Sequence, residues 1–346
     1  DPESALLLAV EAAEVTRRAG EPVVVEAEQA LRDALDGPRS RPLVAPGAAA
    51  AARLALSVDG RWAAVRDAAG ALRLWDVAGA PRLVENDMSP ETAPEGPERS
   101  ALSFTPDGQF LLAARAAGGA WRRSLAAPER PPLLVETGVP ARELIVADDA
   151  ARALAIGEVG AALIDLTGQA PPRALAGLSG PVRDASFSPD GLLLLTITAD
   201  GAARLWSARD GRPGRQLRGP GGGIRRARGA WRGDSAAVVL IGPERTAQVF
   251  AVAGGPPRTL RGHTGEVYAV DFSDDGAPRT LALDDSLRLW DDDGGSTRVE
   301  LVRHGEVVGG AQWLPVDDMV LGTPFGGALW LWAADERGEP LVLRGH

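Results

Sequence analysis

Hydrophobic and polar residues alternate in short runs along most of the chain, as in β-strands that present successive side chains to opposite faces. From residue 42 onward these runs are separated by turns rich in Asp, Gly and Pro. The first 37 residues differ, because their apolar positions recur at helical spacing and end at Gly37-Pro38. The pattern predicts a helical hairpin over residues 1–37 and a β-rich domain over residues 42–346.

An internal repeat organises the β-rich domain. An Asp, usually in an Asp-Gly turn, recurs at about 40–49-residue intervals, and 15 to 17 residues after it comes one fixed strand position. The turn residues are Asp59, Asp107, Asp149, Asp190, Asp234, Asp275 and Asp317, and the strand positions are Trp75, Ser124, Asp165, Trp206, Phe250, Trp290 and Trp332. Each unit therefore predicts a small antiparallel sheet of about four strands, which must stack on others to bury both faces.

A recognisable motif runs through residues 42–346 and is strong in the units of Asp59, Asp190, Asp275 and Asp317, two of which show it as follows. Residues 187–191 read Phe-Ser-Pro-Asp-Gly before Ala203-Arg204-Leu205-Trp206, and residues 260–267 read Leu-Arg-Gly-His-Thr-Gly-Glu-Val before Leu289-Trp290-Asp291. These segments resemble WD40 repeats. The resemblance implies an all-β fold, a seven-bladed β-propeller, and a non-catalytic interaction platform that needs no cofactor. We therefore expect protein or peptide partners.

The WD40 resemblance also implies a structural network within a blade. By position, one unit matches it with His263, Thr280, Asp284 and Trp290. An Asp carboxylate accepts from imidazole and an indole donates to a hydroxyl, so the residue types suit one another. The unit of Asp190 has Leu178 at the His position, with Thr196, Asp200 and Trp206 at the others.

The predicted hairpin carries a second resemblance. Residues 1–12 and 27–35 are similar to a segment that precedes the propellers of bacterial STAND-type signalling ATPases. The resemblance implies a missing upstream domain and a cytoplasmic signalling or defence protein. We expect Leu6, Leu7, Val10, Leu31 and Leu35 to pack on one another and on the propeller. The alternatives are a regulatory propeller attached to a protease or kinase and, more remotely, a propeller hydrolase that uses paired carboxylates.

Composition narrows the chemistry further. The 346-residue chain has no Cys and no Lys, which removes disulfides, Cys-ligated zinc, the Walker A lysine and Schiff-base catalysis. Its net charge of -10 disfavours general binding to nucleic acids or anionic membranes. The exclusive use of Arg, with abundant Ala, Gly and Pro, favours a bacterial source. The acidic turn at residues 291–293 lacks the spaced ligands of a calcium loop, so we expect no metal.

Basic residues cluster in one part of the chain. Nine arginines lie within residues 204–232, opposed only by Asp210. Two interpretations stay open: solvated arginines on turns and edges, or a basic sector for an acidic partner. Acidic residues gather instead in the Pro-rich loop around Glu91.

Partners of WD40 propellers usually engage the mouth where the inner strands begin. Alignment of the units on the turn Asp places five residues near that mouth: Arg142, Arg183, Arg225, Glu266 and Tyr268. An exposed Tyr is a good interface anchor, and Arg offers bidentate pairing to carboxylates. We therefore predict a mainly basic rim for an acidic peptide or protein segment.

Two segments compete for the outermost strand of the last unit. Residues 41–44 and 340–343 both have the pattern of an edge strand. The C-terminal copy follows its own unit, so we predict that it pairs there.

Overall fold

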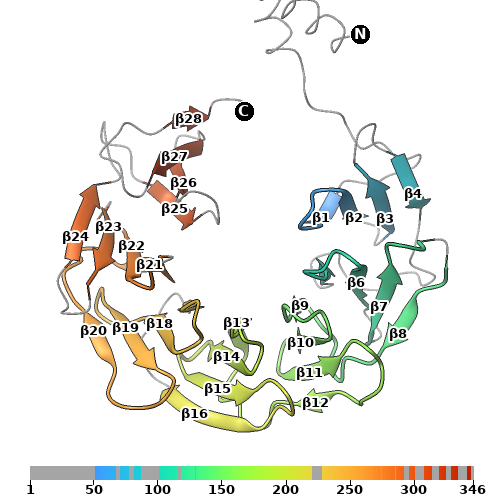
Figure 1. Ribbon diagram of the computed structural model, residues 1–346, viewed down its shortest axis with the longest axis horizontal. Helices are drawn as coiled ribbons and strands as arrows, with labels where there is room; N and C mark the ends of the chain where they lie inside the picture. Colours follow the sequence, from blue (N-terminus) through green and yellow to red (C-terminus); the bar gives the residue numbers. More distant parts are fainter. Residues whose placement is uncertain are drawn as a thin grey trace, which may run out of the picture.

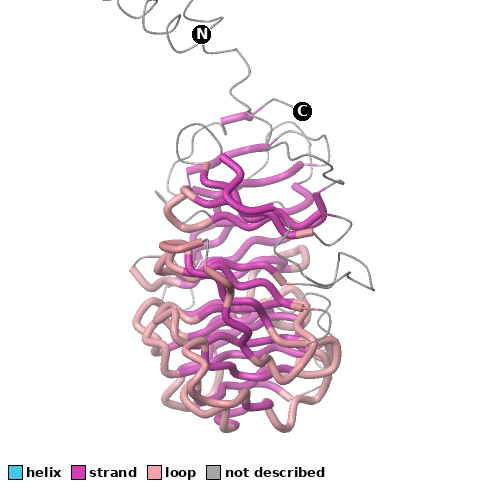
Figure 2. Tube along the Cα trace, turned by 90° about the vertical axis from the view of Figure 1, so that its right-hand side faces the viewer, coloured by secondary structure: helices cyan, strands magenta, loops and turns pink. Residues whose placement is uncertain are grey.

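The computed structural model describes residues 51–67, 71–77, 82–86, 101–115, 118–128, 130–219, 228–273, 275–284 and 286–291, together with the strands within 296–343. All regular structure in this part of the chain is β-strand, as Figure 2 shows, which confirms the all-β class there. None of the described residues forms a helix long and apolar enough to cross a membrane. The predicted hairpin at 1–37 and the strand at 41–44 lie outside the described residues.

The described strands form seven antiparallel sheets, each built from four consecutive strands and numbered here I to VII. Sheets I and II comprise β1 (Ala51–Leu56), β2 (Trp62–Asp67), β3 (Leu72–Asp76), β4 (Arg82–Asn86), β5 (Leu102–Phe104), β6 (Phe110–Ala114), β7 (Ala120–Ser124) and β8 (Leu133–Val135). Sheets III and IV comprise β9 (Glu143–Val146), β10 (Arg152–Ile156), β11 (Ala161–Asp165), β12 (Arg173–Ala174), β13 (Val182–Phe187), β14 (Leu193–Thr198), β15 (Ala203–Ser207) and β16 (Pro213–Arg218).

The other three sheets follow the same plan. Sheets V and VI comprise β17 (Gly229–Trp231), β18 (Ala237–Ile241), β19 (Ala247–Ala251), β20 (Arg258–Leu260), β21 (Val267–Phe272), β22 (Pro278–Ala282), β23 (Ser286–Trp290) and β24 (Ser296–Glu300). Sheet VII comprises β25 (Val308–Trp313), β26 (Met319–Pro324), β27 (Leu329–Ala333) and β28 (Leu341–Leu343). Because β28 pairs with β27, the prediction that the C-terminal segment completes the last unit is confirmed.

The sheets surround a common centre in chain order (Figure 1). The first strand of each sheet is innermost, and consecutive inner strands contact one another from β1 through β5, β9, β13, β17 and β21 to β25. In Figure 1 a gap separates sheet VII from sheet I, so the sheets form an arc in this view.

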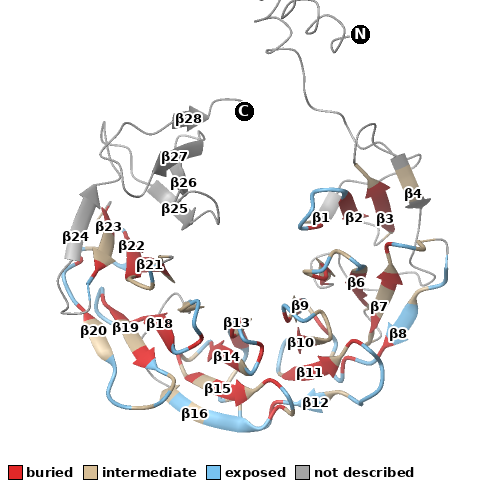
Figure 3. Ribbon diagram, viewed as in Figure 1, coloured by how far each residue is buried: buried red, intermediate tan, exposed pale blue. Residues whose placement is uncertain are grey.

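The core lies between the sheets. One apolar cluster joins each neighbouring pair from I–II to V–VI. In sheet IV, for example, Leu194 packs toward sheet III and its neighbour Leu195 toward sheet V. The middle strands are accordingly buried on both faces, whereas the outer strands β8, β12 and β16 are largely exposed (Figure 3). Stacking thus buries faces that a lone sheet would expose to water.

The repeated Asp holds the turn between the first and second strands of a sheet. In sheet IV, Ser188 Oγ donates to Asp190 Oδ1 at 2.5 Å and the backbone N–H of Leu192 donates to the same atom at 3.0 Å. The described turns at Asp59, Asp107, Asp149, Asp234 and Asp275 have the same backbone donation to the carboxylate. Antiparallel connection then places these turns on one face of the assembly, here called the turn face, and the starts of the inner strands on the opposite mouth face.

The residue after each of these Asp residues has a left-handed backbone. Gly60, Gly108, Gly191 and Gly276 have φ between 65° and 84°, where glycine meets no steric penalty. Ala150 (φ 52°) and Ser235 (φ 61°) adopt the same conformation without that advantage. The turn is therefore a property of the repeat even where the Asp-Gly pair is lost. The fixed strand position likewise falls in the third strand of every sheet, from Trp75 in β3 to Trp332 in β27.

Candidate functional site

The mouth face carries a cavity lined by the starts of three inner strands. It has a volume of about 540 Å³ and brings together Arg142 and Arg183, two of the five predicted rim residues. Leu54, Ala101, Leu102, Glu143 and Leu144 complete its wall. The cavity therefore lies where the starts of inner strands from different units come together.

The two arginines of the mouth cavity differ in their availability. Arg142 is half-buried, and its Nη2 donates to the carbonyl oxygen of Val182 on sheet IV at 2.5 Å. Arg183 is exposed and has no hydrogen-bond or ion-pair partner among the described residues. It sits at the unpaired position of a β-bulge, where the register of β13 shifts between Val182 and Asp184. Arg183 is therefore the guanidinium of this cavity that is available to a carboxylate.

None of the other three predicted rim residues is among the described residues that line this cavity. Glu266 is exposed just before β21, and Arg225 lies outside the described residues. Tyr268 is only 7% exposed, so the expectation of an exposed anchor is wrong. It occupies the bulge position of β21 that corresponds to Arg183 in β13, but its large apolar ring is packed inside whereas the charged side chain of Arg183 is solvated. Tyr268 therefore belongs to the packing of sheet VI.

Asp184 lies next to Arg183 and joins sheet IV to sheet V. Its Oδ2 accepts from the backbone N–H of Gly229 at 2.9 Å, and Oδ1 lies 3.7 Å from Nη1 of Arg228. Burial raises the pKa of Asp184 to about 6, with a further contribution from Glu143, although Gly229 and Arg228 oppose the rise.

Most described arginines of the 204–232 cluster have partners within the protein. Arg215 donates to the carbonyl oxygens of Ala251 and Gly255, both at 2.6 Å. Arg218 donates from Nη1 to the carbonyl oxygen of Ile241 at 2.8 Å. The interpretation of this whole cluster as a free basic sector is thus wrong for these side chains, because they satisfy backbone acceptors of sheet V.

These bonds are part of a pattern that the sequence analysis missed. At each interface from I–II to V–VI, an arginine of the earlier sheet donates to a carbonyl oxygen of the next. The pairs are Arg66 to Ala114, Arg122 to Leu166, Arg142 to Val182, Arg215 to Ala251, Arg218 to Ile241, and Arg258 to Asp291. The exclusive use of Arg in this chain was the sequence feature that could have indicated these bonds. A planar guanidinium can donate to several carbonyl oxygens at once, whereas the ammonium group of Lys acts as a point charge.

The four network residues of sheet VI form a continuous chain of hydrogen bonds. Trp290 Nε1 donates to Thr280 Oγ1 at 2.9 Å, and Thr280 Oγ1 lies 2.7 Å from His263 Nε2. His263 Nδ1 lies 3.1 Å from both carboxylate oxygens of Asp284. These contacts assign the proton to Nδ1, so that the imidazole donates to Asp284 and accepts from Thr280.

Asp284 is held as a carboxylate. Burial alone would raise its pKa, but hydrogen bonds from Ser286 Oγ at 2.6 Å and from the N–H of Thr264 at 2.7 Å, together with His263, hold the pKa below its ordinary value. His263 and Asp284 have side-chain exposures of 1% and 6%. A pair so enclosed, with its acceptors occupied, stabilises sheet VI and offers no base to a substrate.

Sheet IV has a reduced version of this network. Trp206 Nε1 donates to Thr196 Oγ1 at 2.8 Å, as the indole does in sheet VI. Leu178 replaces the histidine, and Asp200 accepts from Thr198 Oγ1 at 2.6 Å instead. A cavity of about 230 Å³ lies between Leu178, Thr196 and Trp206.

Two stretches of the chain match the sequence model of the family described as WD domain, G-beta repeat, at residues 171–207 and 254–291. The chain contains WD40 repeats in these two places. Each match runs from the outer strand of one sheet through three strands of the next, β12 to β15 in the first case and β20 to β23 in the second. No curated protein shows significant similarity to the chain.

The WD40 repeats and the antiparallel sheets together fit a β-propeller. WD40 domains are generally non-catalytic modules that bind proteins or peptides. The His, Asp and Glu residues described by the structure form no group able to hold a metal ion.

Proposed function

We propose that the chain is a seven-bladed WD40 propeller that closes between sheets VII and I and binds an acidic protein segment at its mouth. It would serve as the non-catalytic interaction or sensor domain of a larger, cytoplasmic bacterial signalling or defence protein of the STAND type, with an upstream domain in the same polypeptide. The observation that carries the binding role is Arg183, an exposed guanidinium without a described partner in the wall of the 540 Å³ mouth cavity.

The chemistry of the mouth supports a carboxylate ligand. Arg183 can present two parallel N–H donors to a carboxylate, and Leu54 and Leu102 provide apolar wall beside it. Arg142 adds positive charge, while its bond to Val182 keeps it in place. Glu143 in the same wall disfavours a highly charged anion such as phosphate.

A direct test uses a fluorescein-labelled decapeptide of alternating Glu and Ala, with fluorescence anisotropy as the readout. Arg183→Glu should weaken its binding about tenfold or more, and added salt should weaken wild-type binding. Arg212→Glu is the matched control, because Arg212 is exposed on the turn face and pairs with Asp210. Equal affinity of wild type and Arg183→Glu would refute binding at the mouth.

The sequence of the complete gene tests the proposal that the chain belongs to a larger STAND-type protein. An upstream module with a Walker A motif supports a STAND protein. An upstream peptidase or kinase domain would instead assign the propeller to regulation of that enzyme.

A further inference from the structure

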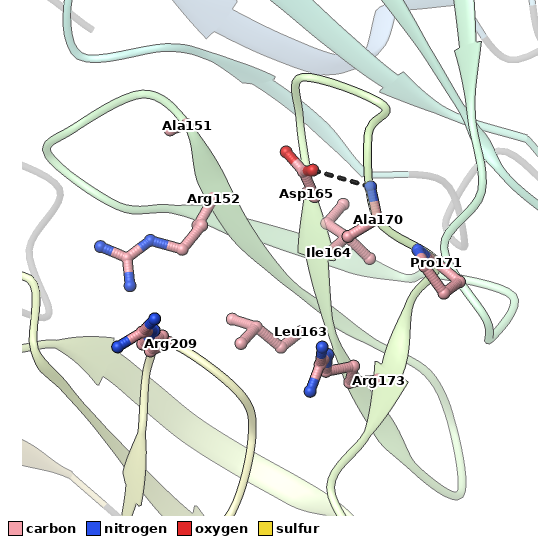
Figure 4. Close-up of a pocket in the computed structure, with 9 residues that line it drawn as sticks. All are labelled: Ala151, Arg152, Leu163, Ile164, Asp165, Ala170, Pro171, Arg173 and Arg209. Carbon is pink, nitrogen blue, oxygen red and sulfur yellow. Dashed lines mark hydrogen bonds between the residues drawn. The ribbon is translucent and has the colours of Figure 1, made fainter.

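A second cavity lies on the turn face, between sheets III and IV (Figure 4). It has a volume of about 290 Å³. Its wall contains Arg152 at the start of β10, Arg173 at the start of β12, and Arg209 from the turn between β15 and β16. We call it the III–IV groove. Figure 4 shows the three guanidinium groups around the side chain of Leu163.

Most guanidinium N–H donors of the III–IV groove have no hydrogen-bond partner among the described residues. Arg173 and Arg209 are exposed and make no hydrogen bond to the described residues, although Arg173 is close enough to Asp210 to help lower the pKa of that carboxyl group. Arg152 pairs with Asp149 through Nε at 3.0 Å and Nη2 at 2.5 Å, which leaves its Nη1 without a hydrogen-bond partner among the described residues. This distinguishes the groove from the sheet interfaces, where arginines donate to backbone carbonyls.

The acidic residue of the wall makes no hydrogen bond to these arginines. Asp165 accepts four hydrogen bonds from the turn that follows it. They come from Thr167 N–H at 2.8 Å, Thr167 Oγ1 at 2.6 Å, Gln169 N–H at 3.1 Å and Ala170 N–H at 2.9 Å. In Figure 4 its carboxylate points toward Ala170. The lining residues therefore carry three arginines against one carboxylate that is already satisfied.

We propose that the III–IV groove binds the carboxylate of a Glu or Asp side chain, presented by an acidic peptide segment with an apolar residue beside it. Arg209 and Arg173 would hold the carboxylate from sheets IV and III, and the neighbouring apolar side chain would rest on Leu163 and Pro171. A singly charged carboxylate suits the groove better than a phosphate dianion, because Asp165 contributes negative charge to the same wall.

The inference extends the proposed interaction role to a second contact, and rests on that role for a protein ligand. The groove and the mouth cavity lie on opposite faces, since one is lined by turns and the other by inner-strand starts. A partner that touched both would have to pass around the rim of the propeller, whereas two partners could occupy them at the same time.

The experiment uses the full chain and short labelled peptides that contain a Glu-Leu pair, a Gln-Leu pair or a phosphoserine-Leu pair. In the Arg183→Glu background, which removes the proposed mouth site, anisotropy should show binding of the Glu-Leu peptide that falls roughly tenfold when Arg209→Ala or Arg173→Ala is added. Arg212→Ala, in the same turn as Arg209 but outside the groove, should leave it unchanged. Arg209→Lys should recover only part of the affinity, because it restores charge without the planar fork.

The outcomes separate the groove from the mouth. Arg183→Glu should leave Glu-Leu binding at the groove intact, so loss of binding in that variant alone would refute the groove while supporting the mouth. Binding of the Gln-Leu peptide as tight as that of Glu-Leu, preference for phosphoserine-Leu, or no binding at all would also refute the proposal. Both substituted arginines are exposed, so thermal unfolding should match wild type in each variant.

Discussion

The carboxylate of Asp184 on sheet IV accepts a hydrogen bond from the backbone N–H of Gly229 on sheet V at 2.9 Å, with the side chain only 17% exposed. This contact joins the inner strands β13 and β17 of neighbouring sheets. Burial raises the pKa of Asp184 to about 6, so the folded protein holds a proton there more tightly than the unfolded chain does. Burial of Asp184 therefore costs the fold most when the carboxyl group is ionised, although the hydrogen bond from Gly229 favours the ionised form.

The raised pKa predicts a pH-dependent gain from Asp184→Asn. The folded value exceeds the ordinary value of 3.8, so the contribution of Asp184 to stability declines as pH rises from about 4 to about 6. Removing the charge should raise the free energy of unfolding by about 1–2 kcal/mol at pH 7.5, less than the full shift because solvent screens a partly exposed side chain, and by nothing at pH 4. Urea denaturation of wild type and Asp184→Asn at both pH values measures this change in the free energy of unfolding.

Asp190→Asn provides the control for that experiment, because hydrogen bonds from Ser188 and Leu192 lower the pKa of Asp190. It should reduce stability at pH 7.5 rather than increase it. A stability loss in Asp184→Asn at pH 7.5 would contradict the assignment of a costly buried charge.

The networks of sheets VI and IV predict unequal costs for the same substitution. Thr280→Val removes the partner of both Trp290 Nε1 and His263 Nε2, whereas Thr196→Val removes only that of Trp206 Nε1. Leaving a buried polar group unsatisfied costs about 1–3 kcal/mol. We expect losses of about 2–4 kcal/mol for Thr280→Val and about 1–2 kcal/mol for Thr196→Val. Equal losses by chemical denaturation would show that His263 does not depend on Thr280.

The left-handed turn at Ala150 predicts a stabilising substitution. With φ at 52°, its Cβ is strained where glycine would not be. Ala150→Gly should raise the free energy of unfolding by about 0.5–1 kcal/mol, after allowance for the greater entropy of the unfolded chain. Ala151→Gly, one residue later and without a positive φ, should lower it by a similar amount. Differential scanning calorimetry of the two variants provides the comparison.

The arginine bonds between sheets predict that Lys cannot replace Arg there. Arg218 donates from Nε to the carbonyl oxygen of Gly201 at 2.9 Å and from Nη1 to that of Ile241 at 2.8 Å, so it spans two sheets. Arg218→Lys keeps the charge but not the fork, and should cost about 1–2 kcal/mol. Arg212→Lys, at a solvated position, should cost almost nothing. The melting temperatures of the two variants test this prediction. An unchanged melting temperature for Arg218→Lys would show that the planar guanidinium of Arg218 is not needed to join the two sheets.

The repeat was visible in the sequence because its markers are local. The Asp of each turn bonds within its own turn, and the fixed strand position falls in the third strand regardless of whether it holds Trp206, Phe250 or Asp165. The four residues of the sheet VI network followed from their positions in a familiar repeat.

The features that were missed depend on neighbouring sheets. A β-bulge places Tyr268 and Arg183 at corresponding positions, and the packing around it buries the aromatic ring of Tyr268 while the charged side chain of Arg183 is exposed. The acceptors of Arg215 and Arg218 lie 36 and 23 residues away along the chain, on another sheet. The spacing of residues within one repeat unit cannot predict contacts between different sheets. The III–IV groove was missed for the same reason, since Arg152 and Arg209 come from different units.

The construction of every described sheet from four consecutive strands determines how the molecule should come apart under tension. No sheet in this part of the chain borrows a strand from a distant segment, so a force applied at the two ends can detach one sheet while the rest keep their backbone hydrogen bonds. Each detachment would release a unit of roughly 40 residues, or about 14 nm of extended chain. A single molecule stretched between its termini should therefore lengthen in a series of similar steps.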